Sequence, residues 1–390
     1  MKQRIIVLVL FVLFVFPLLT GCWNMRELEH MFYAHAVGVD YQNNQFKIYV
    51  QILDFTTLGK QESGGGQGDK QGSWVGKGVG KTFQAALHDL YATTQRRIYW
   101  GHVNTAVLSE AVLKFGIHEI LDQFTRYSEF RYSLWIFGTQ NSVEDILLSS
   151  PIMESSPVYS QLGDPTDVYD QNSSIHPMRL YSLITDIREP GKTVLLPMIN
   201  LSEGHWVDNK MRYRALKVGG VGIIDAGKWY GFLSAEAFTG ARWLDSRAAR
   251  IPLALDSEKQ PVATVVFKHP QTQITPEIRQ GKVFFNLKIK VRGNINEMDS
   301  EVSDSIIRSR AEEMIREEIR NTFAKGLKQK VDALNLLESL YRQKNHEWAQ
   351  LKASKSFPLT EDSLQNIEIN ISITSRGRTT ESFPINGGKE

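Results

Sequence analysis

The sequence contains a single cysteine, Cys22, among 390 residues. Because a disulfide needs two thiols, none can form within the chain, and packing alone must stabilise the fold. A strong excess of charge of either sign is also missing, since 45 Lys and Arg residues stand against 43 Asp and Glu residues. Domains that bind nucleic acid usually carry a clear basic excess. We therefore expect no nucleic-acid partner.

Motifs of the common hydrolases and metalloenzymes are missing as well. The chain has no G-x-S-x-G elbow, and His346-Glu347-Trp348 lacks the second histidine of H-E-x-x-H. The other histidines are scattered and have no paired cysteines beside them. No set of nucleophile, base and oxyanion donors is recognisable. We therefore expect no enzymatic activity, no metal site and no cofactor.

Long hydrophobic runs are absent too. The longest, residues 5–16, is shorter than the roughly 20 residues that a membrane-spanning helix needs. It follows Lys2 and Arg4 and leads to small residues, which is the composition of a secretion signal. We expect residues 1–21 to be a signal peptide. Its removal leaves 43 Lys and Arg residues (45 minus 2) against 43 acidic residues, so the mature chain is formally neutral.

The signal segment ends in Leu19-Thr20-Gly21-Cys22. These four residues resemble the lipobox of bacterial lipoproteins, in which the chain is cleaved before the cysteine and the thiol receives a diacylglyceryl group. The resemblance implies cleavage between Gly21 and Cys22 and a lipid on Cys22. Two or more acyl chains give stable anchoring, whereas one holds weakly. We therefore expect a lipid-anchored protein on the extracytoplasmic face of a membrane.

The stretch SWVGKGVGKTFQAALHDL, residues 73–90, is similar to a phosphate-binding loop, G-x-x-x-x-G-K-[ST]. Gly80, Lys81 and Thr82 fit the end of that pattern, but Val75 replaces its first glycine. The preceding residues 59–73 are too polar and glycine-rich to form the buried strand that the loop requires. We expect Thr82 to cap a helix, the glycines to form a flexible entry, and no nucleotide to bind.

The mature chain is long enough for two or three domains. Residues 22–200 are predicted to form N-terminal α/β structure that carries a glycine-rich insert at 59–75. Alternating apolar residues at 33–53 predict a β-hairpin, after which helices and strands alternate. A helix with a break near Gly116 and a helix with Pro177 in its first turn are among them. The polar residues 202–213 are predicted to mark a domain boundary.

Residues 210–390 are predicted to form C-terminal α+β structure, with a further division near residue 260. The pattern indicates a hairpin around Asp225-Ala226-Gly227, a strand at 281–293 and a long helix from about Ser300. We expect an antiparallel sheet with this amphipathic helix packed on one face. The overall expectation is an α+β, multi-domain protein with mixed and antiparallel sheets flanked by helices.

Four segments of the mature chain resemble the C-subunit lipoproteins of spore germinant receptors, the Ger(x)C or GerAC family. They are GCWNMRELEHMFYAHAVGVD, RRIYWGHVNTAVLSE, GGVGIIDAGKWYGFLSAEAFTGARWL and FFNLKIKVRGNINE. The resemblance covers nearly all of the mature chain except the glycine-rich insert. It implies a non-enzymatic subunit, with three mixed α/β domains, on the outer face of the spore's inner membrane. It also implies a multi-spanning A subunit and a membrane-embedded B subunit as partners in nutrient-triggered germination.

Two clusters are candidates for contact with the membrane or with partner subunits. The first combines arginines with aromatic residues, which dominate interface energetics, and the second is a basic strand face that suits anionic head groups or a partner. An ordinary helix end and a solvated sheet face are the simpler interpretations. The two clusters consist of Arg96, Arg97, Tyr99, Trp100 and His102, and of Lys288, Lys290 and Arg292.

Two other functions are compatible with the sequence. One is a generic extracytoplasmic lipoprotein that binds a small ligand in an inter-domain cleft. The other is a secreted hydrolase with an unrecognised site. A deep pocket with convergent polar groups would favour either of them over a subunit without a ligand site.

Overall fold

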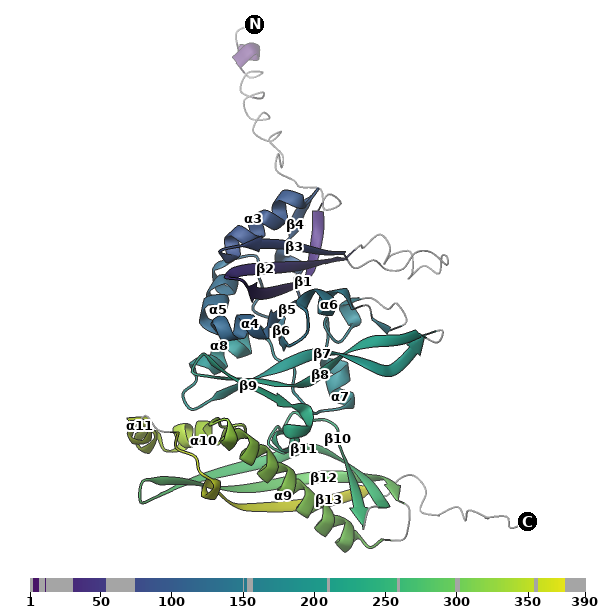
Figure 1. The fold of residues 1–390 in the computed structure, drawn as a ribbon, viewed down its shortest axis with the longest axis vertical. Helices are drawn as coiled ribbons and strands as arrows, with labels where there is room; N and C mark the ends of the chain where they lie inside the picture. The colour runs from purple at the N-terminus through teal and green to yellow at the C-terminus, as the bar shows by residue number, and fades with distance from the viewer. Residues whose placement is uncertain are drawn as a thin grey trace, which may run out of the picture.

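The computed structural model describes residues 3–6, 11, 31–53, 74–149, 151–152, 157–208, 211–257, 260–298, 302–353 and 357–375. Gly21, Cys22 and residues 59–73 of the insert lie outside the described residues, as does most of the predicted signal peptide. The described chain forms two sheets stacked along the long axis of the molecule, each flanked by helices (Figure 1). This arrangement confirms the expected α+β, multi-domain fold.

The first sheet has nine strands in the order β3-β2-β1-β5-β6-β7-β8-β9, with β4 beside β1. Its central strands β1, β5, β6 and β7 are parallel, whereas the hairpins at both sides are antiparallel. The strands are β1 Met31–Gln42, β2 Gln45–Leu53, β3 Trp74–Gly80, β4 Arg97–Tyr99, β5 Thr105–Ser109, β6 Trp135–Thr139, β7 Thr193–Asp208, β8 Met211–Asp225 and β9 Lys228–Ser234.

Helices cover both faces of this sheet because their apolar residues pack into two separate cores. One core contains α3 Phe83–Thr93, α4 Glu110–Phe115, α5 Ile117–Arg126 and α8 Leu180–Arg188, and the opposite core contains α6 Val143–Leu148. The break predicted near Gly116 is confirmed, since its φ of 152° separates α4 from α5. The hairpin predicted at 33–53 is confirmed as β1 and β2, with Asn43 and Asn44 at positive φ in the turn.

The start of α8 differs from the prediction. Pro177 lies three residues before the helix rather than in its first turn. The segment before the helix pairs instead with the edge of β6, because Ile136 N donates to Met178 O and Leu180 N donates to Leu134 O, each at 2.9 Å. A tertiary strand contact thus replaces the helical turn that the local sequence favours.

The polar residues 202–213 do not end the first sheet. The described residues among them, 202–208 and 211–213, lie in the β7–β8 ribbon, and the sheet continues through β9 to Ser234. The predicted hairpin at Asp225-Ala226-Gly227 therefore belongs to the first sheet. Residues 203–207 are exposed because the ribbon extends beyond the core with water on both faces (Figure 1), which explains their polar composition. The division of the chain into domains that fold independently stays a prediction.

The second sheet has the order β10-β11-β12-β13. Strands β10 to β12 are antiparallel, but β13 runs parallel to β12, so the expectation of an antiparallel sheet is wrong for this pair. A parallel neighbour requires a crossover connection, which helices α9 to α11 provide. The elements are β10 Ile251–Ser257, β11 Gln260–Arg279, β12 Lys282–Met298, α9 Asp304–Lys328, α10 Leu336–Gln343, α11 Asn345–Ala353 and β13 Leu364–Ser375.

The long helix predicted from about Ser300 is confirmed as α9, which covers one face of the second sheet (Figure 1). Apolar side chains about four residues apart form the buried stripe of α9. They meet the alternating apolar side chains of β12, which are buried at every second position. The stripe consists of Ile307, Ala311, Ile315, Ile319 and Phe323.

The two sheets are joined by an apolar contact. Val331 and Ala333, from the loop between α9 and α10, pack against Val221 and Ile223 of β8 and Leu233 of β9. Backbone contacts reinforce the joint. Gly191 N-terminal to β7, for example, lies so close to α10 that an added Cβ would be 2.7 Å from Leu337 O. The cavity described below lies at the same joint.

Candidate functional site

Residues 74–90 form a strand and most of a capped helix. Thr82 caps α3 as predicted, because its Oγ1 accepts a hydrogen bond of 3.1 Å from Ala85 N. The prediction of a flexible glycine entry is wrong, since Gly76, Gly78 and Gly80 belong to β3. An added Cβ at Gly78 would lie 2.1 Å from Ala86 O, so the glycines let α3 pack directly against the strand. β3 is an antiparallel edge strand, unlike the buried strand that precedes a phosphate-binding loop.

Four residues of the first predicted cluster lie together beside the start of β1. The rings of Tyr33, Tyr99 and His102 contact one another with centroids 5.2 to 5.8 Å apart. Arg96 lies over the Phe32 ring at 5.9 Å, and Arg97 pairs with Glu129 at 3.5 Å. These side chains form an aromatic and basic surface at the end of the molecule where β1 begins (Figure 1).

Trp100 does not belong to this surface. The predicted strand is interrupted by a 3-10 turn, Trp100–His102, which turns the indole into the core, where it is 1% exposed. There its Nε1 donates a hydrogen bond of 2.8 Å to the Tyr91 hydroxyl. A side chain so buried cannot contact a partner, so the role proposed for Trp100 is wrong.

The second cluster lies as predicted on the uncovered face of β12. Lys288, Lys290 and Arg292 are exposed, and the alternate side chains face α9. Lys288 pairs with Glu368 on β13 at 2.8 Å. Arg292 stands directly opposite Lys268 on β11, and like charges in that position repel. The face therefore keeps a basic character around Lys290, Arg292 and Lys268.

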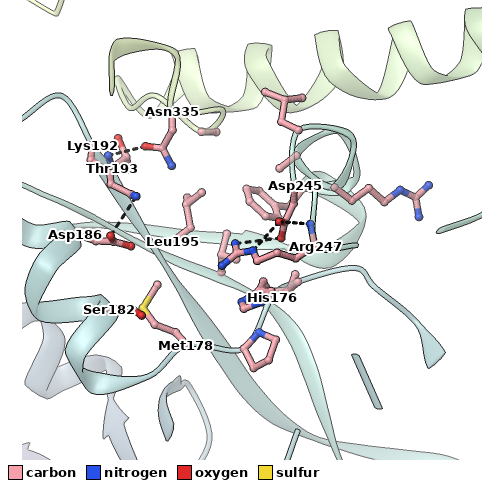
Figure 2. Close-up of a pocket in the computed structure, with 18 of the residues that line it drawn as sticks. His176, Met178, Ser182, Asp186, Lys192, Thr193, Leu195, Asp245, Arg247 and Asn335 are labelled. Carbon is pink, nitrogen blue, oxygen red and sulfur yellow. Dashed lines mark hydrogen bonds and ion pairs between the residues drawn. The ribbon is translucent and has the colours of Figure 1, made fainter. Parts of the chain in front are cut away.

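A cavity of about 500 Å³, partly open to solvent, lies at the joint between the sheets, and the sequence did not reveal its lining (Figure 2). Its walls come from α8, β7, the chain before α8, the turn after β9 and the loop before α10. Leu195, Val221 and Phe238 supply apolar lining. Polar groups come from segments far apart in the sequence, so no local motif marks the site.

Two ion-paired groups face the cavity from opposite sides (Figure 2). On one side, Lys192 Nζ lies 3.1 Å from Asp186 and 3.4 Å from Glu338. On the other side, Arg247 Nε lies 2.7 Å from Asp245 Oδ1. The first group connects α8 and the residue before β7 to α10, so it also links the two sheets.

The environment of Asp245 favours its charged form. Burial opposes ionisation, yet the Arg247 guanidinium and the Arg247 backbone N–H together hold the pKa of Asp245 below its usual range. The Tyr169 hydroxyl donates to the same carboxylate at 3.2 Å, and its own pKa is raised by burial and by Asp245. Burial and then Arg247 lower the pKa of His176, which stacks edge-on against Tyr169 at 4.9 Å.

Arg179 is held differently from the other cations of the lining. Its guanidinium lies 3.3 Å from the centroid of the Trp135 ring, and Nη1 donates to the Ser133 carbonyl. Burial lowers its pKa. Ser182 and Asp186 are four residues apart, which places them on one face of α8, and Arg179 is the extended residue just before the helix. In the sequence this spacing is indistinguishable from that of a solvated polar face.

The lining of the cavity has the composition of a binding site. Within the described ranges, no cluster of three or more His, Cys, Asp or Glu side chains is positioned to hold a metal ion. In the same part of the chain, no helix combines the length and apolar character needed to cross a membrane. The cavity offers fixed charges around an apolar wall, which is the usual composition of a small-molecule site.

The chain matches known proteins along most of its length. The family model of the spore germination protein N-terminal domain matches residues 24–201, and that of the spore germination B3/GerAC-like C-terminal region matches residues 219–380. Spore germination protein KC of Bacillus subtilis (strain 168) is 25% identical over 369 residues, which is 90% of each chain. Spore germination protein B3 of the same organism is 24% identical over 302 residues, which is 76% of each chain.

A solved structure, that of the GerBC protein, is similar at 17% sequence identity with a TM-score of 0.49. The similarity covers 87% of this chain and 96% of that chain. The two family models together span both sheets and the joint between them. The chain therefore belongs to the GerAC-like family of spore germination proteins.

Proposed function

We propose that the protein is a lipid-anchored, non-enzymatic subunit of a spore germinant receptor and is required for nutrient-triggered germination. The family membership of both halves carries this proposal. The lipobox-like Leu19-Thr20-Gly21-Cys22 supports the anchor, because the family match begins only two residues after Cys22. The receptor's A and B subunits and the membrane are its partners, and the outer face of the spore's inner membrane is its location.

The anchor determines which end of the molecule lies near the membrane. Met31, where β1 begins, is the ninth residue after Cys22. A chain of that length spans at most about 30 Å. The aromatic and basic surface of Arg96, Arg97, Tyr99 and His102 lies at this end of the molecule (Figure 1). We assign it to the membrane side, since arginine attracts anionic head groups and aromatic rings suit the interface.

The second sheet, which carries the basic face of β12, lies at the opposite end of the molecule (Figure 1). One flat membrane cannot contact both ends, so we assign Lys288, Lys290 and Arg292 to a partner subunit. The opposed cations Lys268 and Arg292 support this assignment. A like-charged cross-strand pair costs stability, and an acidic partner surface would offset that cost.

Deletion of the gene tests the proposed function. Spores without the protein should germinate slowly or not at all on at least one defined nutrient, and the intact gene should restore the rate. Germination by a non-nutrient route serves as the control, because it shows that the spores are otherwise viable. Normal germination of the deletion spores on every nutrient tested would contradict the proposal.

The inter-domain cavity favours a second function, the binding of a small ligand between the two sheets. Its volume of about 500 Å³ lies within the range of ligand sites. The two functions are compatible, since a receptor subunit can itself hold a ligand.

A further inference from the structure

We propose that the inter-domain cavity binds a small monocarboxylate, with the carboxylate on Arg179 and the hydrocarbon part against the apolar wall. The charges of the lining carry this inference. In the described parts of the chain, Arg179 is the one lining cation that forms no ion pair with a carboxylate. The other cations are paired as follows: Lys192 with Asp186 and Glu338, Arg247 with Asp245, and Arg242 with Glu318.

Arg179 is prepared to receive an anion. Stacking on Trp135 and the bond to Ser133 O fix the guanidinium before a ligand arrives. A guanidinium has five N–H donors in a planar fork, and one of them is used by Ser133. The remaining donors suit a bidentate carboxylate. The negative charge of Asp164 favours the charged form of Arg179, but the two side chains do not form an ion pair.

The neighbourhood of Arg179 favours a single negative charge. Arg179 is the residue that precedes α8, and the positive end of the helix dipole adds to its attraction for an anion. Asp186 follows seven residues later on α8, about 10 Å along the helix axis. Among the described residues that line the cavity, Asp186 and Glu338 share the single cation Lys192, so the lining at this end keeps a net negative charge that would repel a second negative charge on a longer ligand. A dicarboxylate of similar length should therefore bind more weakly than a monocarboxylate.

The rest of the cavity accommodates an apolar body. Leu195 lies between the two ion-paired groups in Figure 2, and Val221, Phe238 and Ala241 continue the apolar wall. Ser182 of α8 adds a hydroxyl to the lining. A ligand with a carboxylate and a short hydrocarbon chain would match this order of charge and apolar surface.

Calorimetric titration of the detergent-solubilised full-length protein tests the proposal. Hexanoate is the probe, and hexanamide, adipate and inorganic phosphate are the comparison compounds. Hexanoate should bind saturably, and each comparison compound should bind at least about tenfold more weakly, since a charge-assisted hydrogen bond is lost or a charge is repelled. Arg179→Gln should weaken hexanoate binding by about tenfold or more.

Arg188→Gln is the matched control, because Arg188 is exposed on the same helix and does not line the cavity. It should leave hexanoate affinity unchanged. If Arg179→Gln fails to fold, Ser182→Leu should abolish binding by filling the cavity from α8. Absence of hexanoate binding, equal binding of hexanamide or phosphate, or an equal loss in Arg188→Gln would overturn the proposal. The deletion experiment on germination is independent of all these outcomes.

Discussion

Thr82 shows how one side chain defines the start of a helix. Its Oγ1 accepts from Ala85 N, which satisfies one of the free N–H groups in the first turn of α3. Thr82→Ala should lower the free energy of unfolding by about 1 kcal/mol. Lys81→Ala, the matched control at the neighbouring exposed residue, should change it by less than about 0.5 kcal/mol. Urea denaturation of both variants measures the difference, and equal effects would contradict the capping role.

The glycines of β3 are needed because they leave room for α3, and not because they make the chain flexible. At Gly78 an added Cβ would meet the backbone oxygen of Ala86 at 2.1 Å, whereas at Gly76 it would meet the movable end of Leu90 at 2.9 Å. Gly78→Ala should therefore cost about 1–3 kcal/mol through overpacking, and Gly76→Ala clearly less. Thermal unfolding of the two variants compares them, and a larger loss in Gly76→Ala would show that α3 does not pack on β3 as described.

Asp332 belongs to the loop that joins the two sheets. It is 2% exposed, and its carboxylate accepts hydrogen bonds from Leu334 N at 3.2 Å and Leu337 N at 2.6 Å. Burial raises its pKa to about 6 despite these bonds. The folded protein therefore holds the proton more tightly than the unfolded chain does, and this contribution to stability is present below about pH 4 and lost as the pH rises to about 6.

Asp332→Asn should remove this pH dependence. A shift of about two pKa units corresponds to about 3 kcal/mol, so the wild type should lose roughly that amount relative to Asp332→Asn between pH 4 and pH 7. Urea denaturation of both proteins at the two pH values gives the difference. A difference that stays constant with pH would show that Asp332 has an ordinary pKa in the folded protein.

At the level of elements, the sequence predicted what local patterns determine. The cap at Thr82, the break at Gly116 and the alternation of β12 depend on neighbours in the chain, and all three are confirmed. The parallel pairing of β13 depends on a distant crossover, and the continuation of the first sheet from β7 into β8 depends on strand partners. Neither leaves a local signal.

The candidate sites also divide into features that local sequence determines and features that depend on distant contacts. Exposure of Lys288, Lys290 and Arg292 follows from strand alternation and is confirmed. The burial of Trp100 depends on a 3-10 turn and on the core around Tyr91, so the aromatic and basic composition of its segment was misleading. The inter-domain cavity requires the packing of two sheets, and its charged residues come from both halves of the chain. Its lining residues could therefore not be predicted from the sequence.

The whole molecule places two different surfaces at opposite ends (Figure 1). Reversal of Lys288, Lys290 and Arg292 to Glu should leave folding intact, because exposed substitutions usually cost under about 0.5 kcal/mol each. It should slow nutrient germination if this end meets a partner subunit, and more so at low salt, where charges are less screened. Melting temperature and germination rate are the two measurements.

Reversal of three exposed cations on α9, Arg308, Lys325 and Lys328, is the matched control. It changes the net charge equally and should leave germination unchanged. Normal germination in the β12 variant would show that this face is an ordinary solvated sheet surface without a partner. A sharp fall in its melting temperature would mean that the face is buried after all.

Cys22→Ala in otherwise unchanged spores tests the lipid-anchored germination subunit most directly. Nutrient germination should fall to the rate of spores that lack the gene. In the same spores, the protein should no longer carry its lipidated, cleaved N-terminus and should leave the membrane fraction after a high-salt wash. A variant that stays in the membrane with an unchanged mature N-terminus and germinates at the wild-type rate would contradict the account.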